Sequence, residues 1–315
     1  MKHSISGRAV WLICTAAAAL AAAALRRWQL RSAFEEYTGL AIPGAQASVV
    51  LVCVLVMIGA WLVILSLASR PVSAHWYQGF LFVREPVYPV LEITASFFAI
   101  AAAPVLFIVG VGQFQLCQEM LDAGLQPPTD NGLLTLATAA GAFLAMLGLL
   151  QTGRDSLNPG RRGRGGFSIV LPGVAGCIWL MESFRSHAAN PVRWDYAPQL
   201  LAIVLGMAFY MDFAGMTAGM ARPRRLLWMA GMTEVFSAIA LVTTASELAA
   251  RSNQGLSLCC TQLGDLLLLL SQTLAAAGVL WRLPSSLEKP VPDGLSGPDP
   301  SPEPIQTIQE DTTDE

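Results

Sequence analysis

Eight apolar segments of 16 to 24 residues alternate with more polar segments along the chain. An apolar run near 20 residues is long enough to cross the hydrocarbon core of a bilayer as a helix. Backbone polar groups find no partner in lipid, so each segment is predicted to be helical. The pattern therefore predicts an all-α fold, a polytopic integral membrane bundle of about eight transmembrane helices within residues 1–283. The predicted spans are 9–25, 47–68, 91–112, 132–151, 167–182, 197–220, 226–248 and 262–281.

The first apolar segment, 9–25, has a second interpretation. It contains the run TAAAALAAAAL, and alanine is only weakly lipophilic. A basic start, an apolar run and a small-residue site near residues 22–24 also describe a secretory signal peptide. The sequence leaves open whether this segment is a retained helix or a cleaved signal, in which case seven spans would remain.

Composition supports the membrane interpretation and separates a tail from the helical domain. The chain of 315 residues is 54% hydrophobic and 13% charged, whereas soluble domains are about 25% charged. The net charge of −3 conceals a slightly basic region, 1–283, and a strongly acidic one, 284–315. Residues 284–315 are rich in proline and contain no aromatic residue. We therefore predict a disordered acidic tail there.

Basic residues in the short connecting segments predict the orientation. With the N-terminus inside, the inner loops carry nine Arg and the outer loops carry six. By the positive-inside rule, both termini are predicted to be cytoplasmic, although Arg26, Arg27 and Arg31 in the first outer loop argue the other way. The run GRRGRGG places three of these nine basic side chains together at the inner surface, where anionic lipid is a more plausible partner than nucleic acid. These side chains are Arg161, Arg162 and Arg164.

One stretch resembles a known group of proteins. Residues 25–56, LRRWQLRSAFEEYTGLAIPGAQASVVLVCVLV, join an Ala-rich helix to a basic step, the pairs FE and TGL, and a second helix. This arrangement is similar to the start of uncharacterised multi-pass membrane proteins of anaerobic Gram-positive bacteria. The resemblance covers about a tenth of the chain. It implies a location in a bacterial plasma membrane and implies no activity.

Two acids, Asp212 and Glu234, lie inside predicted spans on either side of the basic turn RPRR. Counting about 1.5 Å of rise per residue places both roughly 14–15 Å from that turn, near the bilayer midplane. The short turn predicts that the two helices are antiparallel neighbours. Small residues three and four positions from Glu234 predict that it faces protein, while Asp212 borders a shorter small-residue stripe with Gly215 and Gly219.

Intramembrane acids are expensive and are usually functional. Two carboxylates without a cationic partner in a low-dielectric site should be protonated, share a proton or bind a cation. Asp212 and Glu234 are therefore predicted as a proton- or cation-linked site. The alternative is structural, with two neutral acids hydrogen-bonded to groups such as Thr233 or Ser237 and joining the helices. Asp265 is expected to pair with Arg251, and Glu92 and Glu182 to lie at the two membrane interfaces.

No catalytic motif is apparent in the chain. The histidines form no metal-binding or triad motif, and the cysteines lack metal-ligand spacing. The methionines between 207 and 232 are more typical of core filling than of a copper site. We therefore predict no catalytic residue, no cofactor, no metal site and no nucleic-acid partner.

Two functions fit these observations. The first is a transporter-like protein in which Asp212 and Glu234 form the proton- or cation-linked site. The second is a non-catalytic membrane scaffold or accessory subunit that binds unknown protein partners through its basic loops and acidic tail. Halves of transporters are often related by internal repeats, but no duplication is visible between the first four and the last four spans.

Overall fold

The computed structural model describes residues 7–35, 40–69, 87–125, 132–157, 168–188, 196–218, 220, 222–251 and 256–288. Within these ranges the chain is all-α, with one isolated β-bridge between Phe34 and Ala41. The eight helices are α1 (Gly7–Ser32), α2 (Gln46–Ala68), α3 (Val87–Asp122), α4 (Leu133–Leu157), α6 (Val170–Ala188), α7 (Ala197–Thr217), α8 (Pro223–Arg251) and α9 (Leu256–Glu288).

Seven of these helices are long and apolar enough to cross a membrane, as expected for a multi-pass membrane protein. The eighth, α6, coincides with the predicted span 167–182 but falls short of the others in length and apolar character. Its polar end, which includes Glu182, Arg185 and His187, accounts for the difference. The prediction of eight helices is confirmed for the described ranges, and seven of them qualify as membrane spans.

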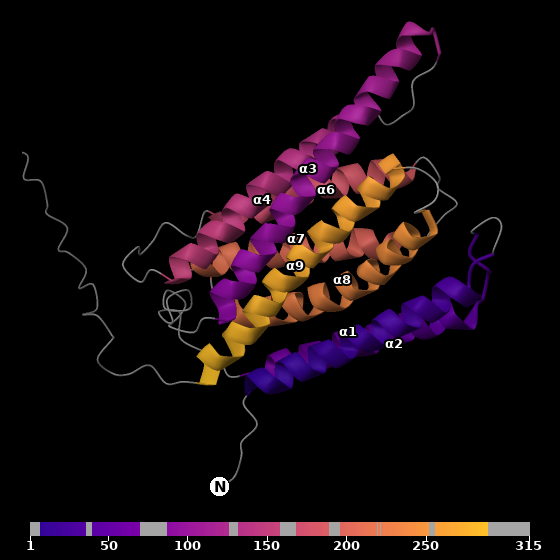
Figure 1. The fold of residues 1–315 in the computed structure, drawn as a ribbon. Helices are drawn as coiled ribbons and strands as arrows, with labels where there is room; N and C mark the ends of the chain where they lie inside the picture. Colours follow the sequence, from indigo (N-terminus) through magenta and orange to yellow (C-terminus); the bar gives the residue numbers. More distant parts are fainter. Residues whose placement is uncertain are drawn as a thin grey trace, which may run out of the picture.

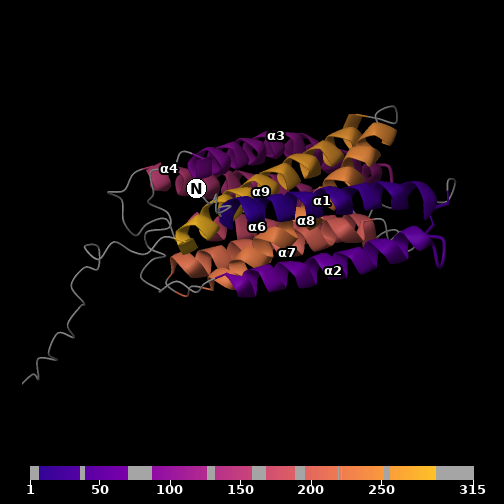
Figure 2. The same cartoon turned by 90° about the horizontal axis from the view of Figure 1, so that it is seen from below.

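Successive helices run up and down the bundle (Figures 1 and 2). We call the end at which α1 begins and α9 ends the proximal end, and the opposite end the distal end. The hairpin of α1 and α2 lies along one side of the bundle, where α1 packs against α8 (Figure 1). Helix α9 lies inside the assembly, against α3 and α8 and also in contact with α1.

Helices α3 and α9 exceed their predicted spans by the most residues. Helix α3 contains Pro104 and continues to Asp122, ten residues beyond the predicted end at 112. Gly132 (φ 71°), just before α4, approaches α3 so closely that a Cβ there would lie 2.5 Å from the carbonyl oxygen of Gly110. The last turns of α3 therefore project past the start of α4 (Figure 1). Helix α9 begins at Leu256 and continues through Pro284 to Glu288.

Candidate functional site

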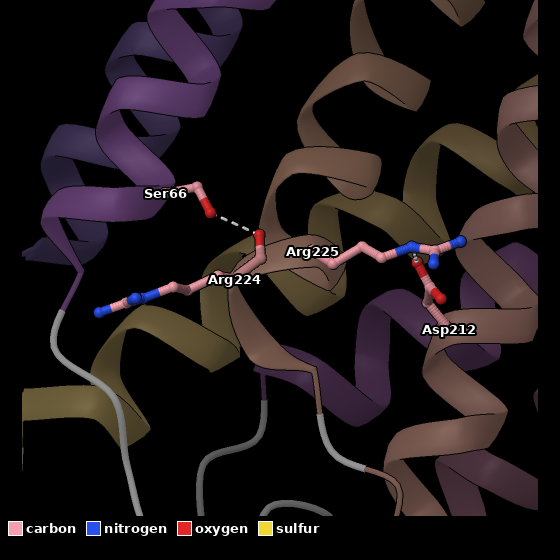
Figure 3. Close-up of polar contacts among 4 residues, drawn as sticks. All are labelled: Ser66, Asp212, Arg224 and Arg225. Atoms are coloured by element: carbon pink, nitrogen blue, oxygen red, sulfur yellow. Dashed lines mark hydrogen bonds and ion pairs between the residues drawn. The ribbon is translucent and has the colours of Figure 1, made fainter.

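The structure gives Asp212 a cationic partner, so the prediction that this acid lacks one is wrong. Asp212 Oδ2 lies 2.8 Å from Arg225 Nε in the first turn of α8 (Figure 3). The two atoms form an ion pair by distance, although their angle does not meet hydrogen-bond geometry. The Asp212 side chain is 12% exposed and the Arg225 side chain 49%. This pair gives the Asp212 carboxylate a countercharge near the edge of the bundle.

The physical reason is the true end of α7. The helix ends at Thr217 and not at residue 220, so Asp212 lies about 8 Å from its end at 1.5 Å per residue. Glu234 lies about 16 Å from the start of α8 by the same measure. Asp212 is therefore closer to the turn than predicted, within reach of a long Arg side chain. Gly215 makes no close helix contact, and Gly219 lies outside the described residues.

Glu234 keeps the environment that the sequence predicts. Its Oε1 atom is buried and makes no hydrogen bond within the described part of the chain. Gly231, one turn earlier on α8, faces Leu62 of α2 and Thr15 of α1. Thr233 Oγ1 makes no hydrogen bond to any described group, and Ser237 accepts one from Gln272. The carboxylate is therefore enclosed by protein without the hydrogen bonds that the structural alternative requires.

Glu92, on the second turn of α3, is the most enclosed acid in the described ranges. The residue is 0% exposed, and neither carboxylate oxygen accepts a hydrogen bond of normal geometry from a described group. A Cβ at Gly278 of α9 would lie 3.5 Å from Glu92 Oε1, and one at Gly153 of α4 would lie 3.4 Å from Glu92 Cβ. These two glycines leave just enough room for the side chain where α3, α4 and α9 meet.

Polar and charged groups gather around Glu92 at the proximal end. The hydroxyl of Tyr88, one turn earlier on α3, and that of Tyr210 on α7 both interact electrostatically with the carboxylate. Arg282 is buried one turn beyond Gly278 on α9 and interacts with Tyr88. The Glu92 side chain therefore points into the bundle, at the level of its proximal end.

Asp265 on α9 is also buried, and two of its partners lie on α6 and α7; the side chain of the predicted partner, Arg251, lies outside the described residues. Trp179 Nε1 of α6 donates a hydrogen bond of 2.8 Å to Oδ1, and Gln199 Nε2 of α7 donates one of 3.1 Å to Oδ2. The ring of His187, at the end of α6, lies close enough to interact electrostatically with the carboxylate. His187 itself stacks on Tyr196 with a centroid distance of 4.6 Å. Three helices therefore hold this acid in place.

Glu182 is buried in a third polar site, between α3, α4 and α6. Thr135 Oγ1 lies 3.4 Å from Glu182 Oε1 and 3.0 Å from Gln113 Oε1. The sequence placed Glu182 at an interface; the structure places it inside the bundle, at only 4% exposure.

A cavity of about 40 Å³ lies between the levels of Asp265 and Glu92. Its walls come from α4, α6, α7 and α9, and its polar lining includes Trp179, Tyr210, Ser271 and Gln272. On α9, the lining residues 268–272 fall between Asp265 and Gly278, which touches Glu92. The cavity and the two acids thus follow one line along the inner face of α9.

Sequence reasoning identified Glu92 and Asp265 as acids near membrane spans but missed their roles in the interior. The signal that could have found them is the distribution of polar residues on α9. Gln262, Asp265, Ser271, Gln272 and Arg282 are all buried, so an otherwise apolar helix carries polar groups along its length. Such a helix belongs in the centre of a bundle and not against lipid.

Some predictions lie outside the described residues. They include the lipid contacts of Arg161, Arg162 and Arg164 and the tail beyond residue 288, on which the scaffold hypothesis depends. Among the residues that the structure does place, no group of three or more His, Cys, Asp or Glu side chains could hold a metal ion. Cys117 and Cys260 are free thiols.

Comparison with known proteins adds no assignment to this geometry. No protein-family model, curated protein sequence or solved structure matches the chain. The chain is therefore characterised by its own features, as an all-α protein with seven helices able to span a membrane and with buried carboxylates along α9.

Proposed function

We propose that this protein is a transporter-like membrane protein that moves protons through the interior of its bundle, with Glu92 and Asp265 as the principal proton-binding groups. The observation that carries the proposal is the environment of Glu92. A fully buried carboxylate that has the Tyr88 hydroxyl beside it, but no hydrogen bond of normal geometry from a described group, is costly as an anion because its desolvation is poorly compensated. The group is stable when it holds a proton, and it can release that proton only when the site changes.

Asp265 complements Glu92 in this proposal. Its two oxygens accept hydrogen bonds from neutral donors, Trp179 and Gln199, which lower the cost of the anion without neutralising it. One carboxylate is thus solvated by the protein and the other is not. Such a difference between two acids allows a proton to reside on one and pass to the other.

Asp212 and Glu234, the two acids predicted from sequence, have a smaller role in the proposed proton movement. Asp212 lies beside a cationic partner, Arg225, near the edge of the bundle, and is not enclosed as Glu92 is. Glu234 retains a buried oxygen without a hydrogen bond in the described ranges and remains a further candidate on α8. We also propose a bacterial plasma-membrane location with the proximal end facing the cytoplasm, on the basis of the Arg distribution and the resemblance of residues 25–56.

Proton flux through liposomes tests the proposal. The purified full chain is reconstituted with a pH-sensitive dye inside, and a pH gradient is imposed with the membrane potential clamped. Wild-type protein should carry protons well above protein-free liposomes, and Glu92→Gln should lower that flux at least tenfold. Glu119→Gln is the matched control, since it makes the same change at an exposed position of the same helix and should leave flux unchanged.

Two results would count against the proposal. If wild-type liposomes acidify no faster than empty ones, the protein does not move protons. If Glu92→Gln conducts like wild type, Glu92 is not the proton-binding group. Both variants must first elute as wild type does in size-exclusion chromatography, so that a loss of flux reports chemistry and not misfolding.

A further inference from the structure

The cavity between the two buried acids has polar groups that the protein itself does not use. Gln272 Nε2 donates to Ala202 O and Ser237 Oγ. Gln272 Oε1 accepts no hydrogen bond from a described residue, and this atom keeps some accessible surface. The same holds for the Tyr210 hydroxyl. Both side chains line the cavity, so their free oxygen atoms can face it.

Two hydroxyls in the cavity wall add further acceptors. Ser271 Oγ donates to Ala95 O at 2.8 Å, and Thr138 Oγ1 donates to Leu134 O at 2.9 Å. Each hydroxyl oxygen keeps lone pairs that can accept a hydrogen bond from a guest molecule. A buried water needs two to four polar partners and about 10–15 Å³ of space, so a cavity of about 40 Å³ suits two or three waters.

The position of the cavity gives those waters a possible role. Trp179, whose indole nitrogen donates to Asp265, forms part of the cavity wall. Tyr210, on the same wall, interacts electrostatically with Glu92. Along α9, Asp265 lies three residues, or about 4.5 Å, before Leu268 on the cavity wall. Gly278, which touches Glu92, lies six residues or about 9 Å beyond Gln272.

We propose that this cavity is a water-filled relay that carries protons between Asp265 and Glu92. The inference rests on the proposed function and identifies the transported species and its route. A proton moves along hydrogen-bonded waters by exchanging bonds, so it needs only polar contacts at each step. Ca²⁺ and Mg²⁺ take six or more oxygen ligands, usually with carboxylates among them, and the cavity lining contains no acid.

The first measurement asks whether water occupies the cavity. X-ray radiolysis of water in the purified full chain oxidises side chains next to bound water, and mass spectrometry locates the products. Met207, which is partly buried, and Trp179, which is 5% exposed, both line the cavity wall and should be oxidised. Ala142→Leu places a larger side chain in the cavity wall and should reduce that oxidation several-fold. If neither side chain is oxidised in the wild-type protein, the cavity is dry. That result overturns the inference, even if the protein carries protons in liposomes.

The second measurement asks whether the water matters for flux. Ala142→Leu should lower proton flux in liposomes at least fivefold, whereas Ala140→Leu, at an exposed position of the same helix, should not. Tyr210→Phe removes one hydroxyl without filling space and should lower flux more mildly, so it tests the relay if Ala142→Leu does not fold. When a sodium gradient replaces the proton gradient, the liposomes should take up no more sodium than protein-free liposomes do.

The outcomes separate the two proposals. Oxidised Met207 and Trp179 with wild-type flux in both Ala142→Leu and Tyr210→Phe would overturn the relay while leaving proton movement intact. Oxidised side chains with no flux in wild-type liposomes would overturn the proposed function and, with it, the transport role of the cavity. Water in the cavity together with a selective loss of flux supports both.

Discussion

At the scale of single residues, Asp265 shows where sequence reasoning ends. The sequence predicts this acid about one turn inside the last span, but α9 begins at Leu256 and places Asp265 about two and a half turns from its start. Its donors, Trp179 and Gln199, are 86 and 66 residues away in the chain. No local pattern of spacing or charge could connect them, because the contacts exist only after α6, α7 and α9 have packed.

The hydrogen bond from Trp179 makes a prediction about stability. Trp179→Phe should leave Asp265 Oδ1 without this donor and should lower the free energy of unfolding by about 1–3 kcal/mol, the cost of a buried polar atom that loses its partner. Trp61→Phe on α2 is the control, since Trp61 is 51% exposed and its change should have little effect. Equilibrium unfolding in mixed detergent micelles measures both. Equal losses for the two variants would contradict the role of this bond.

The ion pair of Asp212 depends on where α7 ends. The sequence places three Arg side chains beside the turn, but treating residues 218–222 as helical moves them too far from Asp212. Once α7 ends at Thr217, the flexible stem of Arg225 can reach the carboxylate. A helix boundary that is misplaced by a few residues can therefore lead to the wrong prediction of which charged residues pair.

At the scale of elements, hydropathy finds the helices but not their ends. Residues 113–122, QFQLCQEMLD, are too polar for a predicted span, yet they contain good helix formers and no glycine or proline. Helix α3 therefore continues through them to Asp122. Helix α9 also exceeds its predicted span at both ends, although its C-terminal extension contains Pro284. Hydropathy reports where lipid begins, whereas helix propensity decides where the hydrogen-bonded backbone ends.

Gly148 allows α4 and α6 to approach each other closely, and we predict that a larger residue there is destabilising. A Cβ at Gly148 would lie 2.4 Å from Ser168 O and 2.8 Å from Pro172 Cδ, so no small rotation relieves the clash. Gly148→Ala should therefore separate the start of α6 from α4 and lower the melting temperature in detergent by several degrees. Gly112→Ala on α3 is the matched control because nothing lies within 4 Å of its Cβ position.

The control is expected to differ in sign and not only in size. Alanine is favoured over glycine inside a helix by about 0.5–1 kcal/mol, so Gly112→Ala should be neutral or slightly stabilising. A destabilisation by Gly148→Ala no larger than that of Gly112→Ala would mean that α4 and α6 can adjust their spacing.

The end of α2 and the start of α8 are joined by a hydrogen bond. Ser66 Oγ donates to Arg224 O at 2.5 Å (Figure 3).

At the scale of the whole molecule, the sequence predicts the class of protein better than its interior. The number of helices and their membrane character follow from apolar length alone. The arrangement around α9 does not, since α1 and α3 pack against it, and Trp179 of α6 and Gln199 of α7 bond to it, from distant parts of the chain. Buried Arg26 on α1 is a similar case, because its bond to Thr243 of α8 spans 217 residues. Long-range partners decide which polar residues become buried.

Orientation belongs to this scale and can be measured directly. Glu119 is exposed on the distal projection of α3, and Arg222 is exposed at the proximal turn between α7 and α8. In a variant without native cysteines, Glu119→Cys should react with a membrane-impermeant maleimide in intact cells. Arg222→Cys should react only after the membrane is opened. The reverse pattern would show that the Arg count of the loops misassigns the cytoplasmic side.

The central place of α9 also has a consequence for synthesis. This helix is the last of the described helices to leave the ribosome, yet it fills the space against α3 and α8 and brings Asp265 to Trp179 and Gln199. Until it enters the membrane, the preceding helices can be inserted but cannot close around their polar groups. Assembly of the interior is therefore a late event after insertion, and a ribosome stalled before α9 would release an open bundle that quality-control proteases can recognise.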